Sequence, residues 1–328
     1  MDNLTHTLTG LALSRAGLNR LTPQATAILM LAANAPDIDG VSAAGGSLVY
    51  LKYHRNLTHS LLMAPFMALL PLAVVRLVTR KPVDWRWGYL ASLLGLASHL
   101  ALDLTNVYGV RLLLPFSARW LRLDLTSVVD PWIWGALLLA VIGPALGRLV
   151  DSEIGAKARP GRIAAILALA FLLAYNGARA AIHGRALAIL NSRIYEGGSP
   201  RQVAAFPDAF SPFAWRGVTQ GASFYALFDW DVRREFDPAA GTLFYQPDES
   251  EAMRLASQTE PFRVFLDFAQ FPAWTVTPVF EPPGGLRVQL TDLRFGTPRR
   301  PGFTAVALLD GRSQVTRSWF SFSRPVLR

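Results

Sequence analysis

Long apolar runs dominate the first 190 residues of this 328-residue chain and constrain its fold more than any other feature. A run of roughly 20 predominantly apolar residues can cross a lipid bilayer as a single helix. The mean hydropathy of +0.28, with 17% charged residues, is too apolar for an ordinary soluble enzyme of this length. We therefore expect an integral membrane protein.

Six helical segments are expected in this part of the chain. They cover residues 4–17, 24–35, 60–79, 88–104, 131–149 and 162–182. Three or four of them have the length of a membrane span. The first two predict a short hairpin that enters the membrane halfway, and Pro65 and Pro71 are expected to kink the third.

Beyond residue 190 the chain becomes rich in Phe, Trp, Pro, Asp and Glu, and the long apolar runs stop. Short strand-like runs follow, at residues 222–228, 262–268, 286–290, 304–309 and 318–322. The predicted fold is an α-helical integral membrane domain over residues 1–190, followed by a soluble, mostly β domain over residues 191–328.

Charge and composition exclude several classes of function. The net charge is +9, but Lys and Arg lie mostly between apolar segments, so membrane topology and anionic lipid explain them better than nucleic acid does. The chain has no cysteine, and therefore no disulfide or thiolate chemistry. It also has no phosphate-binding loop, nucleophile elbow or dinucleotide fingerprint.

Four of the five histidines fall within the first 103 residues, each beside a carboxylate or a hydroxyl group. Ionisable groups in apolar membrane segments are costly and are usually retained for a function. They form four clusters: Asp2 with Thr5 and His6, Asp37 with Asp39, His54 with Thr58, His59 and Ser60, and His99 with Asp103.

The chain direction predicts that these clusters meet. If consecutive helices run antiparallel, the start of the first, the end of the second, the start of the third and the end of the fourth share one side of the membrane. His99 and Asp103 are four residues apart, so both side chains leave one helical face. Asp37 and Asp39 lie in a turn that can aim both carboxylates at a cation.

Imidazole and carboxylate are the ligands of hydrolytic metal centres. The predicted ligands are His6, Asp37, Asp39, His54, His59, His99 and Asp103. Seven donors exceed the needs of one zinc ion and allow one or two ions, with zinc first and manganese or iron as alternatives. Asp37, Asp39 and His59 are the candidate catalytic residues, with a carboxylate as general base.

Structural readings of the same residues remain open at this point. A lone His99–Asp103 pair is more often hydrogen-bonded than metal-bound, and Asp-x-Asp after proline is commonly a turn or a cap. Thr58, His59 and Ser60 can cap a helix.

The sequence motifs at these residues resemble a known family. They are MDNLTHTLTGLALSRAG, PDIDG, HRNLTHS, HLALDLTNVYGVRLLLPFS and LDLTSVVDPWIW. They are similar to those of the bacterial membrane-bound metal-dependent hydrolase family, the DUF457 group, which includes a LexA-regulated inner-membrane protein. The resemblance covers about the first 150 residues, and PFAWRGV at residues 212–218 is similar to the C-terminal part of longer members.

The resemblance implies a bacterial inner-membrane protein with a His/Asp metal centre and a presumed hydrolase activity. It places the centre on the seven residues named above and, further along the chain, on Asp124 and Asp130. It implies no particular substrate.

Basic residues predict the orientation in the membrane. On the side opposite the clusters we place Arg15, Arg20, Arg76, Arg80, Lys81, Arg86, Arg148, Lys157, Arg159 and Arg162. The cluster side carries Lys52, Arg55, Arg111, Arg119 and Arg122. The excess of positive charge marks the cytoplasmic side, so the metal site and the β domain are expected on the outer, periplasmic side.

Three functions follow from this interpretation. The first is hydrolysis of a phosphoester or ester in a lipid or lipid-linked substrate, since Arg55, Arg111, Arg119 and Arg122 would ring the site and guanidinium recognises phosphate. The second is a membrane anchor with a structural metal, whose C-terminal domain binds an envelope protein. The third is a metal-ion transporter or sensor.

Overall fold

The computed structural model describes residues 1–153 and 161–322. The chain divides into two compact units. The first comprises Met1–Asp39, Arg55–His183 and Pro207–Pro212, and the second comprises Gly40–His54, Gly184–Phe206 and Phe213–Arg328. The expected domain boundary near residue 190 stays a prediction.

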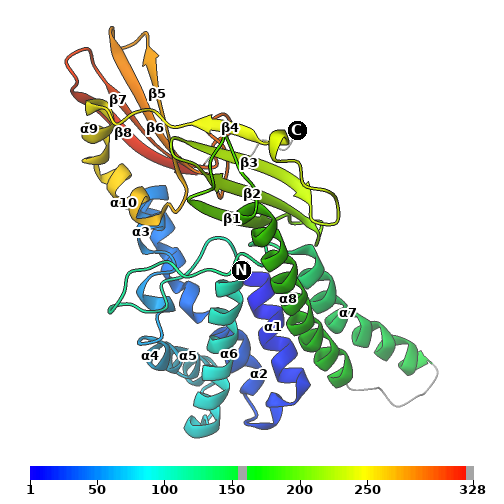
Figure 1. Ribbon diagram of the computed structural model, residues 1–328. Coiled ribbons are helices and arrows are strands. Elements are labelled where there is room, and N and C mark those ends of the chain that lie inside the picture. Colours follow the sequence, from blue (N-terminus) through cyan, green and yellow to red (C-terminus); the bar gives the residue numbers. More distant parts are fainter. Residues whose placement is uncertain (154–160, 323–328) are drawn as a thin grey trace. The chain divides into compact units, whose positions relative to one another are not determined.

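The described part of residues 1–191 is mostly helical, with a long loop over residues 106–130 (Figure 1). Its helices are α1 (Asn3–Ala16), α2 (Ala25–Ala32), α3 (Ser47–Tyr53), α4 (Ala64–Met67), α5 (Leu69–Thr79), α6 (Trp85–Thr105), α7 (Pro131–Glu153) and α8 (Arg162–Asn191). Short 3-10 helices cover Leu18–Arg20, Ala35–Gly45 and Leu57–His59. Five of the six expected helical segments are thus confirmed.

The expected helical segment over residues 60–79 begins only at Ala64, and it is divided into α4 and α5 by a break at Ala68. Pro65 lies in the first turn of α4, and Pro71 lies in the first turn of α5. A proline lacks the N–H that a continuing helix needs, but a first helical turn leaves that N–H unused. The two prolines therefore lie in the first turns of two short helices, on either side of the break at Ala68.

The helices also supply fewer membrane spans than the three or four expected. Among the described residues, α8 is long and apolar enough to cross a bilayer, and the bent segment from Ser47 to Thr79 adds one more at most. At a rise of about 1.5 Å per residue, α1 and α2 are too short to span. Large apolar side chains are nonetheless exposed along α5, α7 and α8, including Leu77 (78% exposed), Leu139 (71%) and Ile163 (73%). Such surface belongs against hydrocarbon.

Aspartates begin the helices that carry or support the polar clusters. The side chain of Asp2 accepts hydrogen bonds from the N–H groups of Leu4 and Thr5 at the start of α1. Asp84 caps α6 through the N–H groups of its first turn, and Asp130 does the same for α7. Gly17 ends α1 with a φ of 144°, a conformation that L side chains rarely adopt.

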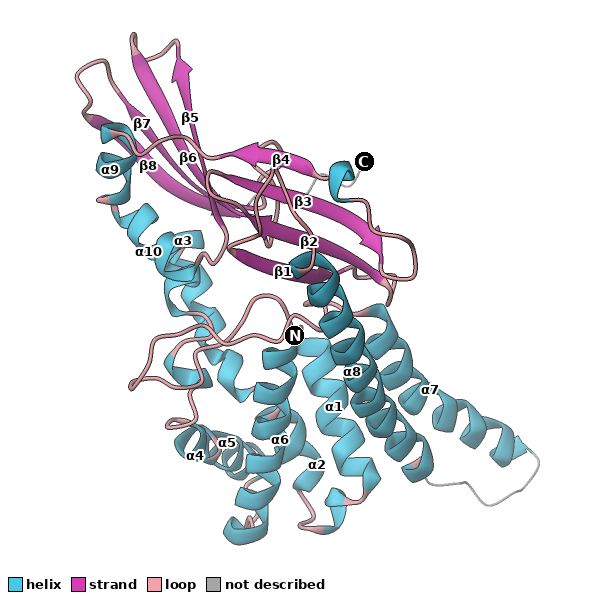
Figure 2. Ribbon diagram, viewed as in Figure 1, coloured by secondary structure: helices cyan, strands magenta, loops and turns pink. Residues whose placement is uncertain are grey.

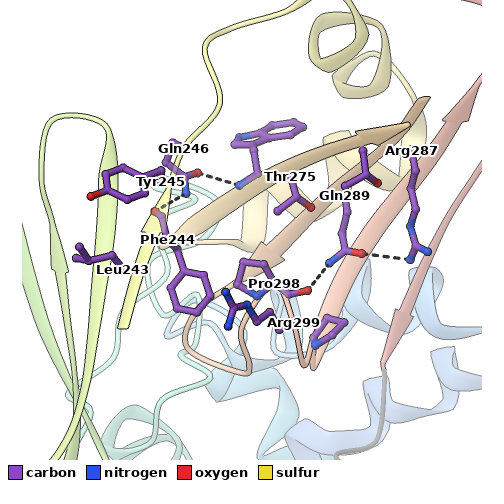
Figure 3. Close-up of a pocket in the computed structure, with 12 residues that line it drawn as sticks. Leu243, Phe244, Tyr245, Gln246, Thr275, Arg287, Gln289, Pro298 and Arg299 are labelled. Carbon is purple, nitrogen blue, oxygen red and sulfur yellow. Dashed lines mark hydrogen bonds between the residues drawn. The ribbon is translucent and has the colours of Figure 1, made fainter. Parts of the chain in front are cut away.

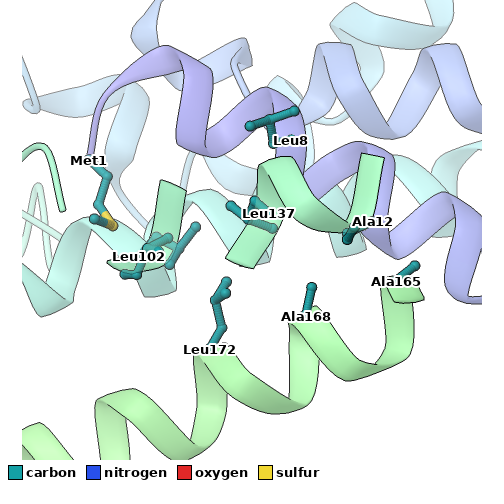
Figure 4. Packing of buried hydrophobic residues seen from close by; sticks show 10 residues of the cluster. Met1, Leu8, Ala12, Leu102, Leu137, Ala165, Ala168 and Leu172 are labelled. Carbon is teal, nitrogen blue, oxygen red and sulfur yellow. The ribbon is translucent and has the colours of Figure 1, made fainter. Parts of the chain in front are cut away.

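A buried apolar cluster joins α1, α6, α7 and α8 (Figure 4). Figure 4 shows Leu8 and Ala12 of α1 near Leu137 of α7, with Ala168 and Leu172 of α8 completing the contact. Small residues in this cluster let helix backbones approach closely, and such packing contributes to helix association in membranes.

Two glycines bring helices still closer. A Cβ atom on Gly10 of α1 would lie 2.7 Å from the carbonyl oxygen of Leu29, and a Cβ atom on Gly95 of α6 would lie 2.8 Å from the same oxygen. The backbones of α1 and α6 therefore both contact α2 at Leu29. Gly95 is one helical turn before His99, so this contact fixes the depth of that histidine against α2.

The second unit is built on two four-stranded antiparallel sheets (Figure 2). The first contains β1 (Gln202–Pro207), β2 (Ala214–Gln220), β3 (Phe224–Asp231) and β4 (Thr242–Tyr245). The second contains β5 (Pro272–Val279), β6 (Gly285–Asp292), β7 (Phe303–Leu309) and β8 (Val315–Phe322). In both sheets the strands follow their order in the sequence.

Two helices, α9 (Glu251–Ser257) and α10 (Glu260–Phe268), pack on the second sheet. The expected strand at residues 262–268 is therefore wrong. Phe262, Phe265 and Phe268 recur every three residues and are all buried, which is a helical spacing. Pro261 stands in the first turn of α10, where proline is favoured.

Candidate metal centre

Four of the predicted ligands converge in the first unit. Asp37, His59, His99 and Asp103 each offer a ligand atom, and these atoms all lie within 4.8 Å of one another. The side chains of His59, His99 and Asp103 are fully buried, whereas that of Asp37 is 11% exposed. The cluster is thus closed except at Asp37.

The distances within the cluster are short. His59 Nε2 lies 3.4 Å from Asp37 Oδ1 and 3.1 Å from His99 Nε2. His99 Nε2 lies 3.4 Å from Asp103 Oδ2. Two imidazole nitrogens and two carboxylate oxygens therefore face a common point, the donor number and type that a zinc ion takes.

Local structure explains how distant residues meet. His99 and Asp103 are one turn apart on α6, as their spacing predicted. Asp37 lies in the 3-10 helix that follows α2, and His59 ends the 3-10 helix Leu57–His59. The end of α2, the start of the third segment and the end of α6 thus come together as the alternating chain direction predicted.

Asp39 lies behind His59 and orients it. Asp39 Oδ2 is 3.1 Å from His59 Nδ1, and it accepts hydrogen bonds from Arg55 N at 2.9 Å and Thr58 Oγ1 at 2.7 Å. A carboxylate on the far ring nitrogen is the usual partner of a metal-binding histidine, because it fixes the ring and raises its basicity. Within the first unit, this geometry gives Asp39 a supporting position.

His99 is oriented by the backbone. Its Nδ1 lies 2.7 Å from the carbonyl oxygen of Ala33. Since a carbonyl can only accept, Nδ1 carries the proton and Nε2 presents its lone pair to the cluster.

His6 lies beside the cluster. Its ring stacks on His99 with centroids 3.9 Å apart, and its Nε2 is 3.3 Å from Asp103 Oδ1. In the described structure, neither ring nitrogen of His6 nor Oδ2 of Asp103 has a hydrogen-bond partner. Buried polar atoms without partners cost roughly 1–3 kcal/mol each. A cation bound here would offset that cost, so these side chains fit a divalent metal ion.

Arg55 and the α-amino group of Met1 also contact Asp103. Arg55 is 3% exposed, and its Nη2 lies 3.0 Å from Asp103 Oδ1 while its Nη1 donates to Asn106 Oδ1 at 3.0 Å. The α-amino group of Met1 also donates to Asp103 Oδ1. Burial and the nearby Arg55 lower the pKa of this amino group well below its ordinary value.

The four arginines that were expected to ring the site do not form such a ring. Arg55 is buried against Asp103, and Arg111 is buried over the ring of Trp120. Arg122 pairs with Asp124, whereas Arg119 is exposed. The arginines expected to recognise a substrate are therefore largely committed to internal contacts.

Sequence reasoning missed three neighbours of the cluster. They are the Met1 amino group, the Arg55–Asp103 contact and Asn3, whose Nδ2 donates to Asp37 Oδ2 at 3.1 Å. No local pattern signals them, because each contact joins segments at least 34 residues apart in sequence.

The remaining predicted residues lie outside the group of Asp37, His59, His99 and Asp103. His54 belongs to the second unit, where its ring stacks on Tyr50. Asp130 caps α7 and accepts from the hydroxyl of Tyr175 at 3.2 Å, and burial raises its pKa. Asp2 caps α1, and Asp124 pairs with Arg122.

The second unit contains a cavity of a different character (Figure 3). Its volume is about 550 Å³, and its lining includes Trp274, Arg287 and Arg299. Gln289 accepts from Arg287 at 3.2 Å and donates to the carbonyl of Pro298 at 3.2 Å, which ties the two sides of the cavity together. None of the described residues that line it is His, Asp or Glu, so it lacks the donors of a metal centre.

Comparison with known proteins finds a match for each of the two parts of the chain. Residues 251–325 match the YfhP C-terminal alpha/beta plait domain. A 151-residue stretch is 33% identical to the uncharacterized protein YfhP of Bacillus subtilis (strain 168), covering 43% of this chain and 45% of that protein. The match thus spans slightly less than half of the curated relative. No solved structure matches the chain.

The match of the helical part is more extensive. Residues 1–186 match the family model of the YdjM inner membrane protein, which is more than half of the chain and includes the whole His/Asp cluster. The protein is therefore located in the inner membrane, in agreement with its apolar helix α8. The chain belongs to the YdjM inner membrane protein family.

Proposed function

We propose that this protein is a membrane-bound, metal-dependent hydrolase that acts on a phosphoester or ester bond of a lipid or lipid-linked substrate. The observation that carries the proposal is the convergence of Asp37, His59, His99 and Asp103 around one point. The buried atoms of His6 and Asp103 that lack hydrogen bonds support a cation at that point.

His59, His99, Asp37 and Asp103 would hold the metal, and zinc suits this mixture of imidazole and carboxylate best. A bound divalent metal acts as a Lewis acid that polarises the phosphoryl or carbonyl oxygen of the substrate. His59 and His99 are prepared for this role, since Asp39 and Ala33 O occupy their far ring nitrogens.

Asp37 is the residue best placed to handle a proton. It is the member of the cluster that reaches solvent, so water can approach its carboxylate. Asn3 holds Oδ2 of Asp37 by a hydrogen bond at 3.1 Å, while Oδ1 faces His59. With Oδ1 directed to the metal position, Oδ2 of Asp37 would accept a proton from an attacking water molecule as a general base.

The surroundings of the site support the proposal of a lipid substrate. The chain belongs to a family of inner-membrane proteins. Helices of the first unit expose large apolar side chains such as Leu77 and Leu139. A substrate held in the bilayer can reach such a site without leaving the membrane.

The test is hydrolysis by the full chain purified in detergent, with Zn²⁺ or Mn²⁺ supplied. Phospholipids in mixed micelles and a chromogenic phosphodiester are the substrates. We expect metal-dependent cleavage that falls at least 100-fold in Asp37→Asn. The control is Asp248→Asn, an exposed carboxylate of the second unit. Metal-loaded wild-type protein that cleaves none of these substrates would contradict the proposal.

The burial of the cluster favours one second candidate. His59, His99 and Asp103 are fully buried, and closed four-coordinate sites are typical of structural metals. In that case the protein is a membrane anchor whose second unit binds an envelope partner. Wild-type protein that contains metal, loses its folded state on metal removal and shows no hydrolysis would favour this candidate.

A further inference from the structure

A cationic pocket lies in the first unit, at the end of α1 opposite to His6. Arg15 at the end of α1, Arg20 in the following 3-10 helix and Arg162 at the start of α8 line it, together with Pro144 of α7. Its volume is about 290 Å³. Pockets for whole ligands span roughly 300–1,000 Å³, so this pocket suits a small polar group.

The pocket is strongly positive. No acidic side chain is among the described residues that line it, and in the described structure none of the three arginines forms an ion pair. Arg162 is held in place by a hydrogen bond from its Nε to the carbonyl oxygen of Ala16 at 3.0 Å. Guanidinium groups with free donors match the oxygens of a phosphate.

The pocket borders an apolar surface. Ile163 directly follows Arg162 and is 73% exposed, and Leu146 of α7 is 57% exposed. An apolar groove of about 570 Å³ also runs between α7 and α8, lined by residues that include Leu139, Leu167 and Phe171. Arginines next to an exposed apolar helix surface are expected at the level of the lipid head groups.

We propose that this pocket binds the phosphate group of an anionic phospholipid, with Arg15, Arg20 and Arg162 as its ligands. The acyl chains would then lie on the apolar surface of α7 and α8. A free phosphate offers the same head-group chemistry, but it makes no use of that surface. The inference is independent of the metal cluster and of hydrolysis.

Native mass spectrometry of the full chain in detergent tests this site. Phosphatidylglycerol and phosphatidylcholine are added in equal amounts, and the ratio of the two bound lipids is measured. Near a membrane surface each basic residue contributes about a five-fold preference for anionic lipid. We expect Arg20→Gln and Arg162→Gln each to reduce the preference for phosphatidylglycerol about five-fold.

The matched control is Arg76→Gln, because Arg76 is an exposed arginine of α5 that does not line the pocket. It should retain the wild-type preference. Arg20→Gln is the safer variant for folding, since the described structure gives the Arg20 side chain no hydrogen bond. An unchanged preference in both pocket variants would overturn the proposal. So would displacement of phosphatidylglycerol by an equal concentration of inorganic phosphate, which would assign the pocket to the free ion.

Discussion

Asp39 is a single residue whose contacts define a specific role. It lies 3.1 Å from His59 Nδ1 and accepts hydrogen bonds from Thr58 and the Arg55 backbone, so its negative charge fixes the ring. Asp39→Asn keeps the size of the side chain but removes the charge. We expect a 10–100-fold loss of metal affinity, the usual cost of losing such a partner.

Competition with a chromogenic chelator measures that affinity in detergent. Asp248→Asn serves as the control, because it removes the same charge from an exposed position of the second unit. Wild-type affinity in Asp39→Asn would show that Asp39 does not support the site.

Individual residues also show which parts of the site can be predicted from the sequence. His59, His99, Asp37 and Asp103 stand out because ionisable side chains are rare in apolar sequence, and the helical spacing of His99 and Asp103 points both at one centre. Arg55 is expected from the sequence to ring the site and recognise a substrate, yet it is buried against Asp103. Its partner lies 48 positions away, and a contact of that range leaves no local pattern in one sequence.

At the scale of helices, the contact of α6 with α2 controls the site. A Cβ atom on Gly95 would lie 2.8 Å from Leu29 O and 2.9 Å from Ala32 Cβ, so one of the two helices must move. We expect Gly95→Ala to destabilise the protein by about 1–3 kcal/mol. It should also weaken metal binding, because His99 lies one turn further along the same helix.

Thermal unfolding in detergent, followed with and without added Zn²⁺, checks this expectation. Gly135→Ala in α7 is the matched control, since a Cβ atom there meets nothing within 4 Å. It should be neutral or raise stability by up to about 1 kcal/mol, because alanine favours a helix more than glycine does. Equal stability of the two variants would contradict the close packing of α2 and α6.

The elements themselves were predictable to different degrees. Helices with a long apolar run and a clear cap, such as α7 with Asp130 and Pro131, were located closely. α10 was mistaken for a strand because its phenylalanines and Val264 favour strands in isolation. The helix is favoured because α10 buries one aromatic face against the second sheet. That contact forms only in the tertiary structure, so the local sequence does not reveal it.

At the scale of the whole molecule, the orientation in the membrane is open to a direct test. The count of basic residues predicts that the second unit lies outside the cytoplasm and that the α5–α6 turn lies inside. The chain has no cysteine, so single cysteines can be introduced without a background. Asp248→Cys in the second unit and Lys81→Cys in the turn are both exposed positions.

A membrane-impermeant maleimide applied to intact cells should label Asp248→Cys and should label Lys81→Cys only after lysis. Labelling of Lys81→Cys alone in intact cells would reverse the predicted orientation. Either result also shows from which side of the membrane a substrate or partner reaches the second unit.

The metal content of the detergent-purified protein tests the central claim most directly. Elemental mass spectrometry would compare the wild type with His59→Ala and His99→Ala, and with His183→Ala as a histidine outside the cluster. We predict about one zinc, manganese or iron ion per wild-type chain, retained in His183→Ala and lost in both cluster variants. Folded wild-type protein that contains no metal and gains none on titration would contradict the account.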